Sequence, residues 1–359
     1  MPTDRVILVT GVSGYWGSQL AVRLQSEPGY HIIGLDVVPP EGLRDLDFIP
    51  TDVRNPLLAD LLTAEEVDTV CHLAFLDTTR PSDQAFDVNV VGTTRLLQAC
   101  AQAGVRKVVL KSSTAVYGAR PSNPAFLRED HALRGSRRYG YTRDMIEIEA
   151  FCQGFSHREP RLMLTILRFC SIIGPTVDTP LTRFLSEPLT PNLLGFDPLM
   201  QVIHEDDVVA ALAHAVTHDA PGVFNVAAKE ALPLSKIRGL AGKVPLPIFH
   251  PLAYWGVGVL GGTGLRLSHY VPLELDYIRY PWVGDLSRME TELGFQPHYT
   301  AEEALREFAT QHRLGYYLTS SARQALAEQR LRDIIEQRQR ARAQQTADAP
   351  AGEGEGSNE

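Results

Sequence analysis

Three glycines near the amino terminus, Gly11, Gly14 and Gly17, are spaced as Gly-x-x-Gly-x-x-Gly in the segment VILVTGVSGYWGSQL. They follow an apolar run and open a segment of helical period. Glycine lets a backbone approach a pyrophosphate at a helix N-terminus, where free N–H groups and the helix dipole attract anions. A second apolar run ends at Asp36, whose carboxylate would accept hydrogen bonds from a ribose and repel a 2′-phosphate. These residues predict a site for NAD rather than NADP, the alternative being ordinary turn chemistry.

Such a site needs strands and helices that alternate along the chain. Short, nearly continuous apolar runs alternate here with longer stretches of helical period, which indicates strands joined by crossover helices and covered on both faces. We expect an α/β fold, a Rossmann-type doubly wound parallel sheet with a small C-terminal substrate lobe. The predicted strands are 5–10, 31–36, 47–52, 68–74, 106–113 and 162–169, and the predicted helices are 15–27, 56–62, 82–103 and 139–157.

This regularity weakens after Gly174. Proline recurs beyond that point and a further helix is expected near Asp206, so we assign 1–174 to an NAD-binding core and 175–310 to a substrate-binding lobe interleaved with the last core elements. Residues 311–345 predict a charged helical extension, and 346–359 predict a disordered tail. The longest apolar stretch, 251–262, is too short to span a bilayer and predicts a packed helix.

The composition narrows the class of partner. The balance of 34 basic against 43 acidic residues argues against a nucleic-acid or anionic-membrane surface and favours a small-molecule substrate. The four cysteines are scattered without a CxxC pair, and no basic segment followed by an apolar one precedes the first predicted strand. We expect a cytoplasmic protein.

Several segments carry a family resemblance. TGVSGYWG resembles the TGxxGxxG signature of the extended short-chain dehydrogenases/reductases, the NAD-dependent epimerase/dehydratase family. Further matches follow in the family's order: TDVRN (51–55), CHLAF (71–75), NVVGT (89–93), SSTAVYG (112–118), LRFCSIIGP (167–175), QVIHEDDVV (201–209) and DLSRMETELGFQP (285–297). LLGFDPLMQVIHEDD is also similar to a bacterial subgroup labelled UDP-glucose 4-epimerase-like.

The resemblance implies NAD as the cofactor and a homodimer formed through two helices per subunit, those at 82–103 and 139–157. The cofactor-binding residues that it implies are Gly11, Gly14, Tyr15, Trp16, Gly17, Asp36, Asp52, Val53, Leu73, Ala74, Asn89, Ser112 and Tyr141.

The family's chemistry is hydride transfer to and from nicotinamide, coupled to proton transfer by a tyrosine and assisted by a Ser or Thr hydroxyl. Ser113 stands at the hydroxyl position of SSTAVYG, although a serine at a strand end also often caps local backbone. A phenol with an ordinary pKa of about 10 is a poor base near neutrality. The family therefore places a lysine four residues after the tyrosine, where its charge lowers the tyrosine pKa.

The segment YGYTRDMIE (139–147) contains two tyrosines and no lysine. Positions 141, 145, 148 and 152 form an inward stripe at i, i+4, i+7 and i+11 of a helix. YTRDMIEIE is also similar to the YSRDKxExE run of the epimerase-like subgroup. This register makes Tyr141 the catalytic base and puts Met145 where the lysine is expected.

The alternative register pairs Tyr139 with Arg143, because YGYTRDMIE also resembles the family's YGxSKxxxE. It places both residues on another side of the helix, where Arg143 is expected to pair with Glu147 at the surface. In this register a positive charge survives, but a planar guanidinium cannot place a compact ammonium between the tyrosine and the nicotinamide ribose.

The absence of the lysine has a predictable cost. Losing a cation that lowers the tyrosine pKa by about 2 to 3 units would remove about 3 to 4 kcal/mol, roughly a hundred- to thousand-fold in active base. We therefore expect a weak or altered catalyst, or one rescued by another cation such as Lys111, although a lysine at a strand end is usually solvated.

Other residues of suitable chemistry are weaker candidates. His204, Glu205, Asp206 and Asp207 have the residue types of a metal site, but acids at a helix start fit the helix dipole and no second ligand group accompanies them, so no metal is predicted. Arg183 could bind a phosphate or carboxylate, although surface arginine is commoner.

Taken together, these features predict an NAD-dependent oxidoreductase of sugar-nucleotide epimerase/dehydratase type, with an atypical active site that lacks the family lysine. The alternative hypothesis is an NAD-binding sensor or scaffold protein without turnover. The substrate lies beyond these patterns, because specificity resides in loops of unknown geometry.

Overall fold

The computed structural model describes residues 5–43, 45–187, 189–249, 251, 274–317, 329 and 331–332. The chain divides into two compact units, residues 1–309 and 310–359, and the central sheet and the candidate site belong to the first. Most of the predicted packed helix at 251–262 and of the predicted extension at 311–345, and the whole tail at 346–359, lie outside the described residues.

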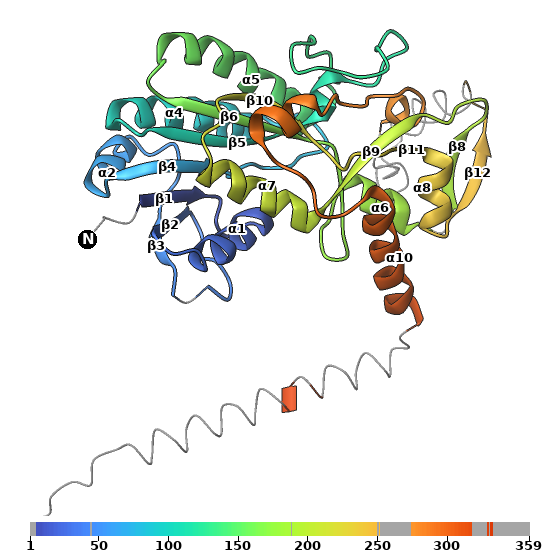
Figure 1. Cartoon of the computed structure of the whole chain (residues 1–359), viewed down its shortest axis with the longest axis horizontal. Helices are drawn as coiled ribbons and strands as arrows, with labels where there is room; N and C mark the ends of the chain where they lie inside the picture. Colours follow the sequence, from blue (N-terminus) through green and yellow to red (C-terminus); the bar gives the residue numbers. More distant parts are fainter. Residues whose placement is uncertain are drawn as a thin grey trace, which may run out of the picture. The chain divides into compact units, whose positions relative to one another are not determined.

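A seven-stranded sheet runs through the first unit (Figure 1), and its neighbouring strands are parallel. The strand order is β10-β6-β5-β4-β1-β2-β3, so the chain starts in the middle and winds outward in both directions. The strands are β1 Arg5–Thr10, β2 Tyr30–Asp36, β3 Asp47–Pro50, β4 Val67–His72, β5 Lys107–Ser113, β6 Met163–Phe169 and β10 Gly222–Val226. The predicted doubly wound α/β fold is confirmed; the edge strand β10 is an addition to the six predicted strands.

Helices cover both faces of this sheet (Figure 1) because alternate strand residues point to opposite sides. Ile7 and Val9 belong to one apolar cluster with residues of α1 and α7, whereas Leu8 belongs to another with residues of α4 and α5. The helices are α1 Tyr15–Gln25, α2 Leu58–Ala64, α3 Asp83–Phe86, α4 Gly92–Ala103, α5 Gly140–Arg158 and α7 Glu205–Thr217. Within the part of the chain that the structure describes, every helix is too short or too polar to span a bilayer.

The predicted helix at 82–103 consists of three segments. Ser82 caps α3, since its hydroxyl accepts from the backbone N–H of Ala85, and a π-helical turn, η1 Asp87–Val91, joins α3 to α4. Such a turn often lies at a functional position. Here it carries the fully buried Asn89, one of the predicted cofactor residues.

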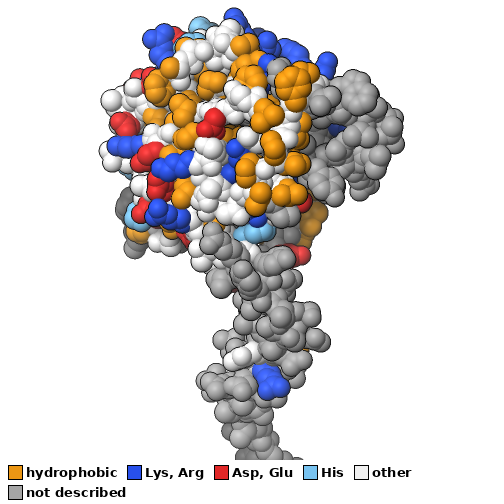
Figure 2. Space-filling view, turned by 90° about the vertical axis from the view of Figure 1, so that its right-hand side faces the viewer, with side chains coloured by type: hydrophobic (Ala, Val, Ile, Leu, Met, Phe, Trp, Pro, Cys, Tyr) orange, Lys and Arg blue, Asp and Glu red, His pale blue; other side chains and the backbone are white. Residues whose placement is uncertain are grey.

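The elements after β6 other than α7 and β10 build the lobe, largely around a third apolar cluster. A three-stranded sheet has the order β11-β9-β7, and β12 pairs with β8. The elements are β7 Ser171–Ile173, α6 Pro180–Ser186, β8 Leu189–Leu193, β9 Leu199–His204, β11 Ala231–Pro233, α8 Leu234–Leu240, β12 Val244–Ile248, and α10 Ala301–Tyr317, with short helical turns η2 Thr114–Tyr117, η4 Leu275–Ile278 and η5 Met289–Leu293. The face that carries β8 and β12 exposes hydrophobic side chains (Figure 2), among them Leu189, Val244 and Leu246.

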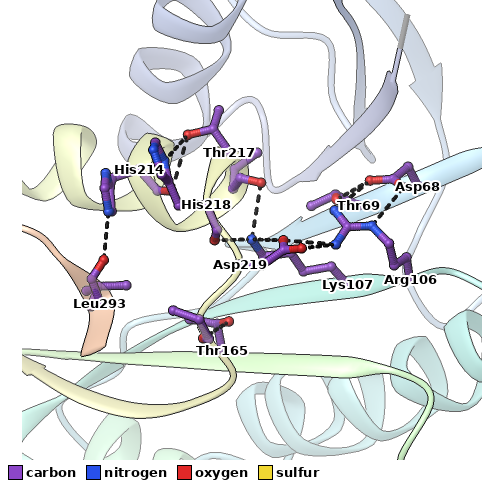
Figure 3. Close-up of polar contacts among 12 residues, drawn as sticks. Asp68, Thr69, Arg106, Lys107, Thr165, His214, Thr217, His218, Asp219 and Leu293 are labelled. Atoms are coloured by element: carbon purple, nitrogen blue, oxygen red, sulfur yellow. Dashed lines mark hydrogen bonds and ion pairs between the residues drawn. The ribbon is translucent and has the colours of Figure 1, made fainter. Parts of the chain in front are cut away.

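A buried lysine ties the end of α7 to the sheet (Figure 3). Lys107, the first residue of β5, donates to the backbone carbonyls of Val216 and His218 at 3.3 and 2.5 Å and pairs with Asp219 at 3.3 Å. Carbonyls at a helix C-terminus lack helical partners and carry a partial negative charge, so the ammonium group stabilises this junction. Arg106 extends the network to Asp68 and Asp219.

Candidate active site

The turn between β1 and α1 has a shape that requires glycine. Gly11 has a φ of +71°, and a Cβ there would lie 2.6 Å from the backbone nitrogen of Ala74. A Cβ on Gly17 would lie 2.2 Å from the carbonyl oxygen of Gly11, so α1 packs directly on the turn. Gly14 caps α1 without a side-chain cap bond. The N–H groups of the first helical turn are therefore free to bind an anion.

Asp36, the last residue of β2, lies beside this turn. Its carboxylate accepts the backbone N–H of Ser13 at 3.1 Å and that of Val37 at 2.7 Å. The N–H groups at the start of α1, where Tyr15 and Trp16 stand, fit the pyrophosphate of NAD, and the fixed carboxylate fits its adenosine ribose. A 2′-phosphate would be repelled by the same carboxylate.

The next predicted cofactor residues follow β4. Leu73 and Ala74 present their backbone to Gly11, so closely that no Cβ would fit between them. Asn89 then fixes the following segment, since its side chain donates to the carbonyl of Leu76 at 2.9 Å and accepts that residue's N–H at 2.8 Å. The strand end beside the glycine turn is therefore held from two sides.

The residues after β3 are engaged with the protein itself. Asp52 accepts from the backbone N–H and the Nε of Arg54 at 2.8 and 2.9 Å, and the guanidinium lowers the pKa of its carboxyl. Val53 is buried in the apolar cluster under α4. A role for these two residues toward adenine remains a prediction.

A cavity of about 220 Å³ adjoins the carboxyl ends of β4, β5 and β6. The fold brings six predicted site residues to its wall: Trp16, Leu73, Ser112, Ser113, Tyr139 and Tyr141. The remainder of the wall comes largely from β7, α6 and the segment around η4, so the cavity lies between the core and the lobe. Ligands of open parallel sheets bind at this edge.

The hydroxyls of Tyr139 and Tyr141 are buried, and neither has a hydrogen-bond partner among the described residues. Burial raises the pKa of Tyr139 to about 12. Burial raises the pKa of Tyr141 well above its usual value, and the nearby acids Asp77 and Glu149 act in the same direction. Buried hydroxyls are ordinarily satisfied. The unpartnered pair therefore points to ligand groups in the cavity.

The phase of α5 is set by a buried ion pair. Glu149 pairs with Arg168 of β6 at 2.5 Å, and the hydroxyl of Ser112 donates to the same carboxylate. The predicted inward stripe is confirmed: Met145, Ile148 and Cys152 are all at most 1% exposed. This phase turns Tyr141 to the cavity and buries Met145 in the apolar cluster behind it.

The predicted surface pair of Arg143 and Glu147 is wrong. Arg143 donates to Asp144 at 2.9 Å, and Glu147 pairs instead with the exposed Arg137 at 2.5 Å. Asp144 is fully buried, so its carboxylate needs a cation more than an exposed glutamate does. The guanidinium of Arg143 also lies over the ring of Phe86, at 5.1 Å, and Arg143 is not part of the cavity wall.

The expectation that Lys111 is solvated holds only in part, because the residue is half-buried in the cavity wall. Its ammonium nitrogen lies 5.4 Å from the ring centroid of Trp16 and 5.8 Å from that of Tyr141, inside the cavity wall. Burial lowers the pKa of Lys111 to about 8, and the charge of Asp77 opposes this shift. A cation therefore stands beside Tyr141, contributed by β5 rather than by α5.

Ser113 combines the two roles that its sequence position allows. Its hydroxyl accepts the N–H of Ala115 at 3.2 Å and so caps the short helical turn η2. The same side chain lines the cavity with Tyr141. A hydroxyl oxygen can accept this bond and still donate to a ligand.

A known protein family matches most of the core that carries this site. The model of the NAD dependent epimerase/dehydratase family matches residues 7–227, which include the glycine turn, β5 and α5. The chain belongs to this family. An uncharacterised protein of Mycobacterium tuberculosis is 36% identical over 318 residues, which cover 85% of this chain and 83% of that protein. UDP-glucose 4-epimerase 4 of Oryza sativa subsp. japonica is 28% identical over 191 residues, covering 48% and 50%.

Solved structures of the family share the fold. The structure of MoeE5 in complex with UDP-glucuronic acid and NAD is 25% identical, has a TM-score of 0.66, and covers 86% of this chain and 99% of its own. A UDP-glucose 4-epimerase from Thermotoga maritima with UDP-glucose is 20% identical, with a TM-score of 0.65 and coverage of 87% and 99%. Both structural neighbours contain sugar nucleotides.

The distant segment at 274–282 contributes a part of the cavity wall that sequence reasoning did not predict. Tyr277 donates to the carbonyl of Ala115 at 2.8 Å and meets Trp282 edge-on, with ring centroids 4.9 Å apart. Glu274 also lines the cavity, and burial raises the pKa of its carboxyl. Asp77 shares this wall, and burial raises its pKa while the charge of Lys111 lowers it. No motif marks these four residues, because tertiary folding alone brings them to the cavity.

The remaining candidates have structural partners. Arg183 pairs with Asp178 at 2.9 Å. Glu205 accepts the N–H groups of Thr176 and Val177 and so holds the turn before α6. Among the described residues, no group of three or more His, Cys, Asp or Glu side chains is placed to hold a metal ion.

Proposed function

We propose that this protein is an NAD-dependent oxidoreductase of epimerase/dehydratase type that acts on a carbinol carbon of a nucleotide sugar. The observation that carries the proposal is the cavity in which the unpartnered hydroxyl of Tyr141 lies between a dinucleotide-type turn and the lobe. The family assignment supports the chemistry. The sugar nucleotides named for the structural neighbours support the substrate class.

In this proposal Tyr141 is the acid–base group. As the phenolate, its oxygen removes the proton of the substrate hydroxyl while the carbinol carbon loses a hydride, and the resulting phenol returns that proton in the reverse step. NAD, when bound, supplies the nicotinamide ring that accepts and returns the hydride. Ser113 donates a hydrogen bond to the same substrate oxygen and fixes its position.

Tyr139 is the alternative base. Its hydroxyl also lies unpartnered in the cavity. The cation four residues after it is Arg143, however, and the guanidinium of Arg143 is bound by Asp144. Tyr141 has the ammonium group of Lys111 facing its ring. We therefore assign the proton transfer to Tyr141 and substrate contact to Tyr139.

The first experiment measures binding and turnover. Calorimetric titration with NAD, followed by incubation with UDP-glucose or UDP-glucuronic acid, is expected to show cofactor binding and a changed sugar, with transient reduced-nicotinamide absorbance. A protein that binds NAD but leaves every nucleotide sugar unchanged would refute the proposed substrate class.

Two matched substitutions separate the tyrosines. Tyr141→Phe is expected to lower kcat by about a hundred-fold or more, because it removes the proton-transfer group, whereas Tyr139→Phe is expected mainly to raise KM. Urea denaturation of both variants serves as the control for folding. The reverse pattern would assign the base to Tyr139.

A sensor without turnover is the second candidate, and the buried Met145 in the family's lysine position favours it. Met145→Lys restores that charge. A sensor predicts activity in the variant and none in the parent; a parent protein that already turns over as fast as the variant excludes the sensor.

A further inference from the structure

The lysine in β5 departs from the strand's pattern. Val108 and Leu110 pack with one layer of helices and Val109 with the other. Lys111 follows Val109 on the same side of the sheet by strand alternation. An apolar residue is expected at such a covered position. The chain instead has a lysine there, and its ammonium nitrogen lies 5.4 Å from the ring centroid of Trp16.

Lys107, four residues earlier in β5, differs from Lys111 in the partners of its ammonium group. Lys107 is fully buried, and its ammonium donates to two carbonyls and pairs with Asp219, so its charge has a structural use. Lys111 has aromatic rings around its ammonium, with Asp77 as the carboxylate that acts on it, and no hydrogen-bond acceptor within the described residues. Lys111 is half-buried, and a charge that loses part of its hydration without gaining such partners is costly. Its retention therefore calls for a functional reason.

The position of the ammonium group supplies that reason. Trp16 belongs to the first turn of α1, where the N–H groups fit the pyrophosphate, and Tyr141 is the proposed base. The ammonium nitrogen of Lys111 lies 5.4 Å from the ring centroid of Trp16 and 5.8 Å from that of Tyr141. The family's helical lysine places a compact cation beside the tyrosine, toward the nicotinamide ribose, and Lys111 brings a cation to the same tyrosine.

We propose that Lys111 has taken over the work of the missing helical lysine, so that the charge that activates Tyr141 comes from β5 instead of position 145. This inference rests on the proposed function and explains how the chain keeps its chemistry with Met145 in the core. Lys111 acts through Tyr141 and is a positioning residue.

The test removes the charge and then returns it to the helix. Lys111→Met is expected to lower kcat by about a hundred-fold. In the pH–rate profile, the limb that reports ionisation of the base is expected to move to higher pH by at least about one unit. Lys111→Met combined with Met145→Lys is expected to recover much of kcat and to move that limb of the pH–rate profile back to lower pH. Lys229→Met, at an exposed lysine paired with Glu290, is the matched control and is expected to change neither.

A second readout needs no turnover. The ultraviolet difference titration of the NAD-loaded protein against its Tyr141→Phe variant isolates the ionisation of Tyr141, and the same comparison in the Lys111→Met background is expected to show ionisation at higher pH. If Lys111→Met does not fold, Lys111→Gln replaces it in the same titration. An unshifted Tyr141 titration overturns the inference, whereas a shifted titration with no turnover supports it and refutes only the proposed reaction.

Discussion

Two glutamates of α5 lie two residues apart in opposite environments. The side chain of Glu149 is 3% exposed and pairs with Arg168, which is 5% exposed. Glu147 is 37% exposed and pairs with Arg137, which is 67% exposed. Water screens the outer pair, whereas the inner pair has lost its hydration and depends on its partner. The inner pair therefore determines which way α5 turns Tyr141.

At the residue scale we predict unequal costs for the same substitution. Glu149→Gln should lower the free energy of unfolding by about 3 to 5 kcal/mol, because it leaves the buried guanidinium of Arg168 without a counter-charge. Glu147→Gln should cost less than about 1 kcal/mol. Urea denaturation of both variants checks this. Equal losses would show that the buried pair does not hold α5.

Among the elements, α1 packs against the glycine turn so closely that no side chain fits between them. Gly17 of α1 rests on the carbonyl of Gly11, at a distance that excludes any side chain. By contrast, Gly154 of α5 has open space around its missing Cβ. The two helical glycines thus differ in their role. Gly17 allows α1 to contact the glycine turn, whereas no neighbouring element packs against the α-carbon of Gly154.

At the element scale we predict opposite effects of adding a methyl group. Gly17→Ala should destabilise the protein by about 1 to 3 kcal/mol and weaken NAD binding, because α1 must move away from the turn. Gly154→Ala should stabilise it by about 0.5 to 1 kcal/mol through helix propensity. Thermal unfolding and NAD calorimetry report both effects. Unchanged NAD affinity in Gly17→Ala would argue against the turn as the cofactor site.

Across the whole 1–309 unit, α7 joins the sheet to η5. His214 of α7 hydrogen-bonds to the carbonyl of Leu293 at 2.8 Å, and its ring stacks on that of His218 with centroids 4.1 Å apart. Burial lowers the pKa of His214, while the bond to Leu293 raises it and the charges of His218 and Lys107 lower it further. Neutral His214 is thus the form that the fold favours.

At this scale we predict a loss of stability in mild acid. Since the folded-state pKa of His214 lies below its unfolded value of about 6.5, the folded protein binds fewer protons there, and stability falls as the pH drops through and below that value. Urea denaturation between about pH 7.5 and 5.5 should show this slope, and His214→Gln should reduce it without removing it, because burial also lowers the pKa of His72, to about 3. The matched variant His31→Gln, at an exposed histidine paired with Asp47, should leave the slope in place.

The sequence alone determined the sheet, the glycine turn and the inward face of α5, because strand alternation, helical period and glycine spacing are local properties of the chain. It could not determine which cation stands beside Tyr141. Arg143 is drawn away by the buried Asp144, and Lys111 is enclosed by Trp16 and Tyr141 from two different helices. Likewise, only folding brings Glu274, Tyr277 and Trp282 to the cavity. Charge, burial and ligand access in this site depend on contacts between distant segments, and those contacts exist only in the tertiary structure.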